Sequence, residues 1–173
     1  MAYQKLQTRE ALEVITSNIV RIPDPNTVVV LNTVSGATVG LAKFDDPNTL
    51  TAVGTKFVDA GINVGAIVYN TTAGQAYYVV SVDSDTQLTL SGGAVGGAND
   101  FYSIYTKATI GCALFVGSTG DVKVQMAQQN GNTSVPVANR TVLYKNIANA
   151  SFLPIQVVRV DANTTATDII AMW

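Results

Sequence analysis

The sequence predicts an all-β protein, and three observations carry this prediction. Apolar and polar residues alternate at period two in most places where a pattern is present, as along Gln87–Leu90. The apolar segments are rich in Val, Ile, Thr, Tyr and Phe, which suit a pleated, half-buried surface. Gly, Asn, Asp and Pro interrupt these segments at short intervals, as turns do between strands.

The alternation also places the individual strands. We expect them at residues 26–31, 37–43, 66–69, 76–82, 87–90, 101–105, 113–116, 122–125, 141–144, 153–160 and 167–172. One segment, Thr8–Glu13, has a helical pattern, but it is short enough to form an extended arm instead. Residues 1–12 have alternating charge and few core residues, so we expect them to be ordered only against a neighbouring molecule.

The chain changes character near Asp45–Asn48, where an acidic pair and a proline indicate a linker or turn. Residues 45–107 form a compact series of short strands and tight turns. We predict a β-sandwich or jelly-roll-like outer domain, residues 1–44 with 108–173, and an inserted small β-barrel or sandwich, residues 45–107. Such insertions are tolerated at exposed loop tips whose ends lie close together.

The composition predicts a protein that works by association. Charged residues make up 13% of the 173 residues, whereas an average soluble protein has about 25%. A chain with so little charge is expected to cover part of its surface with copies of itself or with a larger assembly, because interface cores are depleted in charge. No apolar run reaches the roughly 18 residues of a membrane span, and we expect no signal peptide.

The usual residues of enzyme and metal sites are scarce. Histidine is absent, which removes the commonest general base and a common metal ligand. Cys112 is the single cysteine and lies in an apolar run, so we expect a buried, inert thiol and neither a disulfide nor a thiolate zinc site. The ten basic residues are scattered, which argues against nucleic-acid binding. We therefore expect no enzyme, no cofactor and no metal.

Two short motifs resemble ligand loops, and both are better explained as hairpins. Asp83-Ser84-Asp85 resembles half of a calcium loop, but a strand follows it directly and the expected Gly and Glu are missing. The glycines of Val116–Asp121 resemble a phosphate loop, but no Lys follows them and no helix is expected behind them. We predict a turn at the first motif, and two strands joined by Ser118–Gly120 at the second.

The inserted segment is rich in aromatic residues, and two interpretations are open. The residues are Tyr69, Tyr77, Tyr78, Phe101, Tyr102 and Tyr105. Alternate members are expected to fill the core of the insert while the others face a neighbouring subunit. Alternatively, they form a platform for sugars, since Tyr combines an apolar face with a polar tip.

Three segments of the outer domain, residues 113–124, 139–160 and 164–173, share a pattern whose most specific parts are Gly117-Ser-Thr-Gly-Asp121 and Thr164-Thr-Ala-Thr-Asp168. On these segments, most of the outer domain resembles a family of small bacteriophage virion proteins related to the head-spike base protein of gene transfer agents. Residues 14–23 look like the opening strand of that family. The insert is extra to the family pattern, although residues 57–70 and 82–90 look like a β-module that recurs in phage structural proteins.

The resemblance implies a non-enzymatic virion protein that decorates or cements the capsid, or that forms the base of a vertex spike. Its expected partners are the major capsid protein, other virion proteins and further copies of itself, as a trimer or pentamer, without nucleic acid or membrane. It would be made in the host cytoplasm and reside on the capsid surface. The alternatives are a tail or neck component, and a carbohydrate-binding module for host attachment through the Tyr-rich insert.

The candidate contact residues come from the chain end and from the insert. They are Trp173, Ile169, Ile170, Tyr77, Tyr78 and Tyr102. The chain end is strongly apolar, although chain ends usually fray unless they are tied down. We therefore expect Trp173 to be buried, either in the sheet or at a subunit contact.

Overall fold

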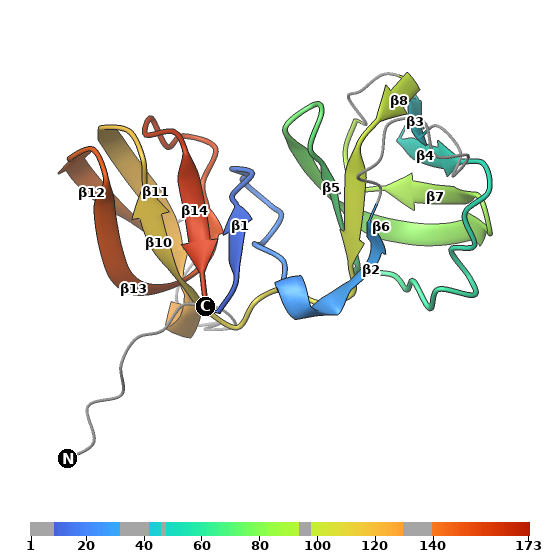
Figure 1. Ribbon diagram of the computed structural model, residues 1–173, viewed down its shortest axis with the longest axis horizontal. Helices are drawn as coiled ribbons and strands as arrows, with labels where there is room; N and C mark the ends of the chain where they lie inside the picture. The colour runs from blue at the N-terminus through green and yellow to red at the C-terminus, as the bar shows by residue number, and fades with distance from the viewer. Residues whose placement is uncertain (1–8, 32–41, 46–47, 94–97, 130–139) are drawn as a thin grey trace, which may run out of the picture. The chain divides into compact units, whose positions relative to one another are not determined.

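The computed structural model describes residues 9–31, 42–45, 48–93, 98–129 and 140–173 (Figure 1). The chain forms two compact units. Unit 1 comprises Met1–Asn18 and Thr109–Trp173, and unit 2 comprises Ile19–Ala108. The described residues form antiparallel sheets with two 3-10 turns and no α-helix, so the predicted all-β class is confirmed.

The described strands of unit 1 form a six-stranded antiparallel sheet in the order β1-β14-β10-β13-β11-β12. The strands are β1 (Ala11–Glu13), β10 (Cys112–Val116), β11 (Gly120–Met126), β12 (Thr141–Ile147), β13 (Ser151–Val160) and β14 (Ile169–Met172). A 3-10 turn, η2 (Ala127–Gln129), follows β11. The C-terminal strand β14 lies inside the sheet, because it pairs with β1 on one side and with β10 on the other.

One face of this sheet carries the core of unit 1. Leu114 and Val116 on β10, Val122 and Val124 on β11, and Ala171 on β14 are fully buried. They occupy alternate positions of their strands, as period-two patterning requires when one face of a sheet is covered. The sequence alternates in this way along Val122–Gln125, whereas Ala113–Val116 is apolar throughout, so only the structure shows which side chains of that strand point inward.

The described strands of unit 2 form an eight-stranded antiparallel sheet in the order β2-β9-β5-β6-β7-β4-β3-β8. A 3-10 turn, η1 (Pro25–Thr27), leads into β2. The strands are β2 (Val28–Leu31), β3 (Ala42–Asp45), β4 (Thr49–Ala52), β5 (Ile67–Asn70), β6 (Gln75–Ser84), β7 (Gln87–Leu90), β8 (Ala98–Asp100) and β9 (Tyr102–Tyr105).

This sheet curls back on itself. Phe101 alone separates β8, at one end of the strand order, from β9, which lies near the other end. The long strand β6 has register shifts along its pairing with β7, and such irregularities let a strand bend. The continuous segment β8–β9 therefore contributes to both sides of the curl, as in a small β-barrel. The curl encloses a core that includes Leu50, Phe57 and Ile104.

The boundary predicted at 44/45 is wrong. Val28–Leu31 pairs with β9, and Ala42–Asp45 pairs with β4 and β8, so both strands belong to the sheet of unit 2. The division lies at Asn18/Ile19 instead, while the second boundary, at Ala108/Thr109, lies one residue from the predicted one. Strands on both sides of the acidic segment 45–48 pair with strands of the same sheet, so this segment lies inside unit 2 and does not mark its boundary.

The two ends of unit 2 lie side by side, as expected for an inserted unit. Asp24 donates a backbone hydrogen bond to the carbonyl of Lys107 over 2.9 Å, and Pro23 forms an isolated bridge with Ala108. Thr27 also accepts a hydrogen bond from the amide of Thr106. The chain therefore enters and leaves unit 2 at neighbouring points, which lets the host unit close around the insertion.

The helical turn predicted at Thr8–Glu13 does not form in the described part of this segment. Ala11–Glu13 is the strand β1, with Leu12 opposite Ala171. Pairing with a neighbouring strand overrides the weak local helical preference of so short a segment. Of the predicted arm, residues 1–8 lie outside the described residues, as does most of the strand predicted at 37–43.

The two predicted hairpins have opposite outcomes. Asp85 and Thr86 form the two-residue turn between β6 and β7, with Ser84 opposite Gln87, so the first hairpin is confirmed. The second is wrong, because β10 and β11 are not neighbours. Strand β13 lies between them, and the loop at Ser118–Gly120 therefore crosses the end of a third strand.

A clasp and a charge-poor surface form the candidate assembly site

The two motifs that carry the family resemblance interlock in unit 1. The loop Gly117–Asp121 and the segment Thr164–Asp168, together called the C-terminal clasp here, lie against each other. The hydrogen bonds across the clasp run from Gly117 N to Asp168 O (3.0 Å), from Thr167 N to Ser118 Oγ (2.6 Å), from Asp121 N to Thr165 Oγ1 (2.8 Å) and from Thr165 N to Asp121 O (2.9 Å). Because Thr164–Asp168 leads directly into β14, the clasp fixes where the last strand begins.

The glycines of the clasp are required by close backbone contact. A Cβ atom at Gly120 would lie 2.5 Å from the backbone nitrogen of Ala166 and 2.7 Å from its Cα atom. A Cβ atom at Gly117 would lie 2.7 Å from Cβ of Asp168. Backbone atoms cannot move aside as a flexible side chain can, so these glycines permit the approach that the hydrogen bonds need.

Replacement of Gly120 by Ala is expected to lower the free energy of unfolding of unit 1 by about 1–3 kcal/mol, the usual cost of overpacking. The physical reason is the clash of the new methyl group with the backbone of Ala166. Urea denaturation followed by circular dichroism measures the change. Gly93→Ala is the matched control, because a Cβ atom there meets nothing within 4 Å. Equal free energies of unfolding for Gly120→Ala and Gly93→Ala would contradict the requirement for glycine at position 120.

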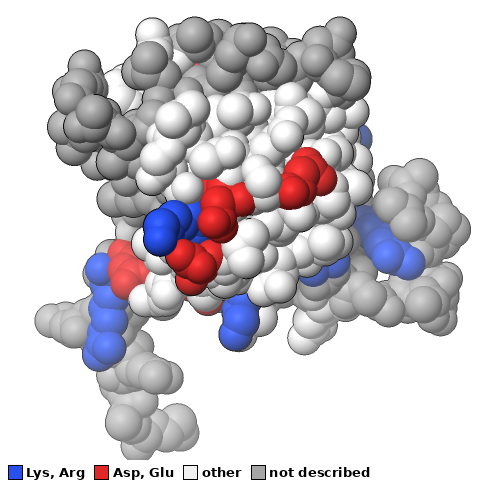
Figure 2. All heavy atoms as spheres, turned by 90° about the vertical axis from the view of Figure 1, so that its right-hand side faces the viewer, with Lys and Arg blue, Asp and Glu red and all other residues white. Residues whose placement is uncertain are grey.

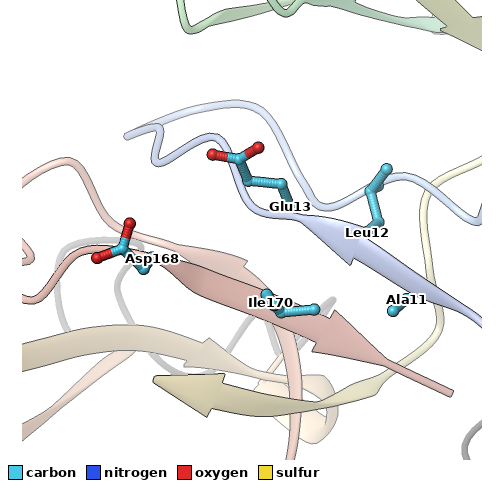
Figure 3. A pocket seen from close by; sticks show the side chains of 5 residues that line it. All are labelled: Ala11, Leu12, Glu13, Asp168 and Ile170. Atoms are coloured by element: carbon cyan, nitrogen blue, oxygen red, sulfur yellow. The ribbon is translucent and has the colours of Figure 1, made fainter. Parts of the chain in front are cut away.

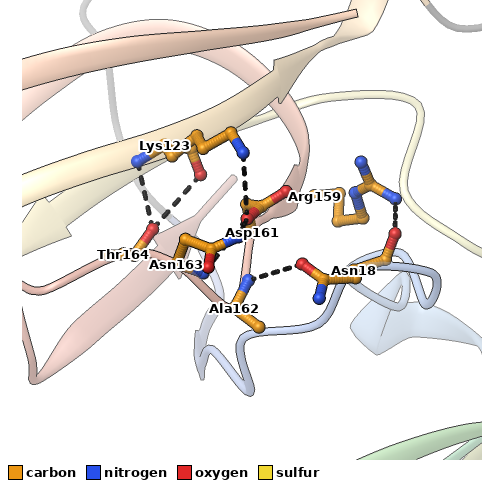
Figure 4. A network of polar contacts seen from close by, with 7 residues as sticks. All are labelled: Asn18, Lys123, Arg159, Asp161, Ala162, Asn163 and Thr164. Carbon is orange, nitrogen blue, oxygen red and sulfur yellow. Dashed lines mark hydrogen bonds and ion pairs between the residues drawn. The ribbon is translucent and has the colours of Figure 1, made fainter. Parts of the chain in front are cut away.

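A second polar network continues from the clasp along β13 (Figure 4). Lys123 Nζ lies 3.4 Å from Asp161 Oδ1, which also accepts hydrogen bonds from the backbone and side-chain nitrogens of Asn163 at 3.0 and 2.7 Å. Arg159 donates to the carbonyl of Asn18. Arg159 and Asp161 are both buried, so the network compensates charges that would otherwise be costly to remove from water.

The network lowers the pKa of Asp161. Burial by itself would raise the pKa of this carboxyl, but the hydrogen bonds from Asn163 and the neighbouring Lys123 charge outweigh burial. The pKa of an Asp carboxyl in the unfolded protein is about 3.9. Because the pKa of Asp161 is lower than this in the folded protein, the ionised carboxyl stabilises the fold at pH values above about 3.9. This contribution to the free energy of unfolding is lost as the pH falls through the folded-state pKa.

Replacement of Asp161 by Asn is therefore expected to destabilise unit 1 at pH 7 by about 1–3 kcal/mol, since a charged hydrogen-bond acceptor is lost from a buried site. The stability difference from the wild type should shrink as the pH is lowered below about 3.9. Thermal unfolding between pH 2 and 7 measures it. Asp59→Asn, which removes only an exposed ion pair with Lys56, is the control and should change little. A difference that stays constant over this pH range would contradict the role of the charge.

The structure anchors the chain end, as the apolar C-terminus predicts, although Trp173 is only partly buried. Its amide donates to the carbonyl of Glu10, and its carbonyl accepts from the amide of Arg9 at 2.7 Å. The indole Nε1 donates to Thr109 Oγ1 at 2.9 Å, and Thr109 is buried. Trp173 therefore ties the last strand to the first. Its side chain is only partly buried within the single chain, so the sheet does not bury it completely, and burial at a subunit contact stays a prediction.

Ile169 and Ile170 point to opposite faces of β14. Ile169 is buried in the core, whereas Ile170 remains partly exposed. Ile170 lies opposite Phe115, which lies in turn opposite Phe152 of β13. These three residues, called the outer row here, form an apolar line over adjacent strands on the face away from the core. Phe152 is 41% exposed.

Sequence reasoning singled out Ile170 but missed Phe115 and Phe152. Phe115 occupies the alternate position between the inward-facing Leu114 and Val116, but this run is apolar throughout, so its sequence does not distinguish the outward position. The sequence did not show that β13 would lie beside β10, and this pairing is what brings the two phenylalanines together.

The tyrosines of unit 2 do not form an exposed platform. Tyr77 and Tyr102 are buried in its core, and so are Tyr69 and Tyr105, whose rings pack edge to face at 5.9 Å. Tyr78 is partly exposed, and its hydroxyl accepts a hydrogen bond from the amide of Arg21 at 3.0 Å. Burial raises the pKa of Tyr102 to about 12, so its hydroxyl stays neutral. Tyr77 and Tyr102 are therefore core residues and are not available as contact residues.

Two surface depressions are formed by described residues. One of about 470 Å³ lies beside β1 and is lined by Ala11, Leu12, Glu13, Asp168 and Ile170 (Figure 3). Another, of about 450 Å³, is lined in unit 2 by residues that include Val58, Val64 and Val82. Val58 and Val64 are more than half exposed. The depression in unit 2 has no charged lining residue, as expected of a surface that contacts other proteins, whereas Glu13 and Asp168 give the depression beside β1 an acidic wall.

Few charged side chains interrupt the surface. Figure 2 shows a face on which acidic and basic residues gather in small groups, with broad uncharged areas around them. Among the described residues, no group of three or more Cys, Asp or Glu side chains could hold a metal ion. Burial raises the pKa of the Cys112 thiol to about 12, and its Sγ donates to the carbonyl of Val157, so the predicted buried thiol is neutral.

Comparison with known proteins identifies no relative. No protein-family model, no curated protein sequence and no solved structure matches this chain. Within the described part of the chain, no helix is long and apolar enough to cross a membrane. The resemblance to phage virion proteins therefore stays a prediction, and a function can be inferred only from the arrangement of the residues themselves.

Proposed function

We propose that this protein is a non-enzymatic structural component of a phage virion, which decorates or cements the capsid or forms the base of a vertex spike. The observation that carries the proposal is the C-terminal clasp. The two segments on which the family resemblance rests, Gly117–Asp121 and Thr164–Asp168, are distant in sequence yet bond directly to each other. Two motifs that depend on each other in space are better evidence for a shared architecture than two independent short matches.

The surface properties support a role in association. Charged residues make up only 13% of the chain, and the outer row presents partly exposed apolar side chains on the sheet of unit 1. A capsid-associated protein needs such a surface for the major capsid protein and for its own copies. Unit 2 is a second folded body with its own core. In a capsid-associated role, unit 2 projects from the shell or connects neighbouring parts of it.

Cryo-electron microscopy of purified virions, with mass spectrometry of the same particles, tests the proposal. We expect the protein in the particles, with density for the two units at regular positions on the capsid. Density confined to the tail or neck would instead support the alternative that the protein is a tail or neck component. Absence of the protein from washed particles would contradict a virion role altogether.

No observation favours carbohydrate binding through the tyrosines of unit 2. Stacking on a sugar requires an exposed aromatic face, and the rings of Tyr69, Tyr77, Tyr102 and Tyr105 are in the core. A glycan-binding role would need a different set of residues.

A further inference from the structure

The sheet of unit 1 ends in two different open edges among the described residues. Strand β1 pairs only with β14, and β12 pairs only with β11. Because six strands alternate in direction, β1 and β12 run antiparallel to each other. A second copy can be rotated about an axis parallel to the strands, so that its strands keep the same direction. Its β1 can then lie beside β12 of the first copy, and the two strands are antiparallel, like all neighbouring strands within the sheet.

The register shows which backbone groups these edges present. The N–H and C=O of Lys123 on β11 point toward Thr164 and Asp161, away from β12. Leu143 lies opposite Lys123, so in an antiparallel ladder its own N–H and C=O point outward, to the open side of β12. Val14, directly after β1, donates to the carbonyl of Ile169. Because neighbouring residues of a strand turn their backbone groups to opposite sides, Glu13 presents its N–H and C=O to the open side of β1.

The side chains on the two edges have complementary charge. Glu13 is the exposed acidic residue of β1, and Arg9 is the basic residue nearest to it on the same side, whereas the carboxyl of Glu10 is partly buried. Asp168 lines the same depression as Glu13 (Figure 3). Strand β12 carries the exposed Lys145, and Arg140 comes directly before it. The acidic residue near β12, Asp121, already accepts a hydrogen bond from the amide of Asn146 at 2.9 Å.

The two edges also match in their solvent-facing side chains. Glu13 lies opposite Ile170, so a strand added beside β1 extends the outer row. Leu143 is 46% exposed, and it shares its face of β12 with Lys145. Pairing of the edges would place Leu143 and Lys145 beside Glu13, which covers an exposed apolar side chain and brings opposite charges together.

We propose that β12 of one copy pairs with β1 of the next copy, so that the six-stranded sheets join head to tail in a closed ring. The contact is heterologous, because two different edges meet, and heterologous contacts close into cyclic oligomers when the rotation permits. The inference rests on the proposed function to the extent that a capsid-associated protein is expected to act as an oligomer. It adds which strands of unit 1 form the contact.

Proline at position 143 tests the backbone part of the contact. Leu143→Pro removes an N–H that points to the open edge and leaves the ladder with β11 intact. Sedimentation velocity on the full chain over a range of concentrations should show a closed oligomer for the wild type. We expect Leu143→Pro to raise its dissociation constant at least about tenfold, the effect of about one lost hydrogen bond. Leu143→Ala keeps the N–H and is the matched control, with a smaller effect.

A charge exchange tests the same contact without a proline. Glu13→Lys and Lys145→Glu should each weaken the oligomer, and the double variant should restore it. Both side chains are exposed in the single chain, so folding should be unaffected, and circular dichroism checks this. This pair keeps the proposal testable even if Leu143→Pro does not fold.

Several results would overturn the edge contact. A wild type that stays monomeric at all concentrations would show that Lys145 protects the edge from pairing, as lysines on edge strands do in other proteins. An oligomer that survives Leu143→Pro, or a double variant that fails to reassemble, would place the contact elsewhere. These outcomes are independent of the virion experiment, since the protein can be found on particles whether or not these edges pair, and the edges can pair in a protein absent from particles.

Discussion

Deletion of Thr167–Trp173 is expected to prevent unit 1 from folding. The deleted segment contains β14, which lies between β1 and β10 and buries Ile169 and Ala171 in the core. Without it, β1 loses its only described partner strand and β10 loses one of its two. The loss of a central strand exceeds the 5–15 kcal/mol or so of stability that a domain typically has.

Amide NMR spectra of the full and shortened chains measure this effect. The resonances of unit 1 should collapse to the narrow range of an unfolded chain, while those of unit 2 stay dispersed because its core is separate. Trp173→Phe is the matched control. It keeps β14 and loses the hydrogen bond from Nε1 to Thr109, so it should cost only about 1 kcal/mol. A folded, particle-binding protein without Thr167–Trp173 would refute the role of this strand.

Replacement of Tyr102 by Ala should lower the free energy of unfolding of unit 2 by about 3–5 kcal/mol, the usual cost of removing a large buried aromatic side chain. Tyr102 is 1% exposed and packs in the core with residues such as Tyr77 and Ile104. Hydrogen exchange of the amides of unit 2 measures the change without interference from unit 1.

The neighbouring Phe101 supplies the control for this prediction. It is 36% exposed and points to the other side of the extended segment, so Phe101→Ala should cost far less than Tyr102→Ala. Comparable losses in the two variants would contradict the assignment of inward and outward faces. The contrast also bears on glycan binding, since loss of binding in Tyr102→Ala would then reflect a destabilised unit and not a lost sugar contact.

The clasp gives the family resemblance a physical meaning. Glycines at positions 117 and 120 and hydroxyl residues at 118, 165 and 167 need each other, because the glycines permit close approach and the hydroxyls complete the hydrogen bonds. In this chain their hydrogen bonds and close contacts hold two segments of one fold together. They are therefore evidence about architecture, and the virion role depends on the experiment with particles.

The sequence by itself determined what is local. Alternation along Gln87–Leu90 predicted a strand, because a strand alternates its faces whatever it pairs with, and the apolar run at Ala113–Val116 predicted another. The two-residue turn at Asp85-Thr86 was also predictable, since only the residues on either side of it are involved. The absence of histidine and the single cysteine limited the chemistry open to this chain, because composition does not depend on the fold.

Only the tertiary structure decided which strands are neighbours. The sequence alternates identically whether β11 follows β10 as a hairpin or is separated from it by β13, so the loop Ser118–Gly120 was misassigned. The domain boundary failed for the same reason, because Val28–Leu31 finds its partner β9 more than seventy residues later in the chain. Pairing partners depend on the summed burial and hydrogen bonding of the whole sheet, which short stretches of sequence do not contain.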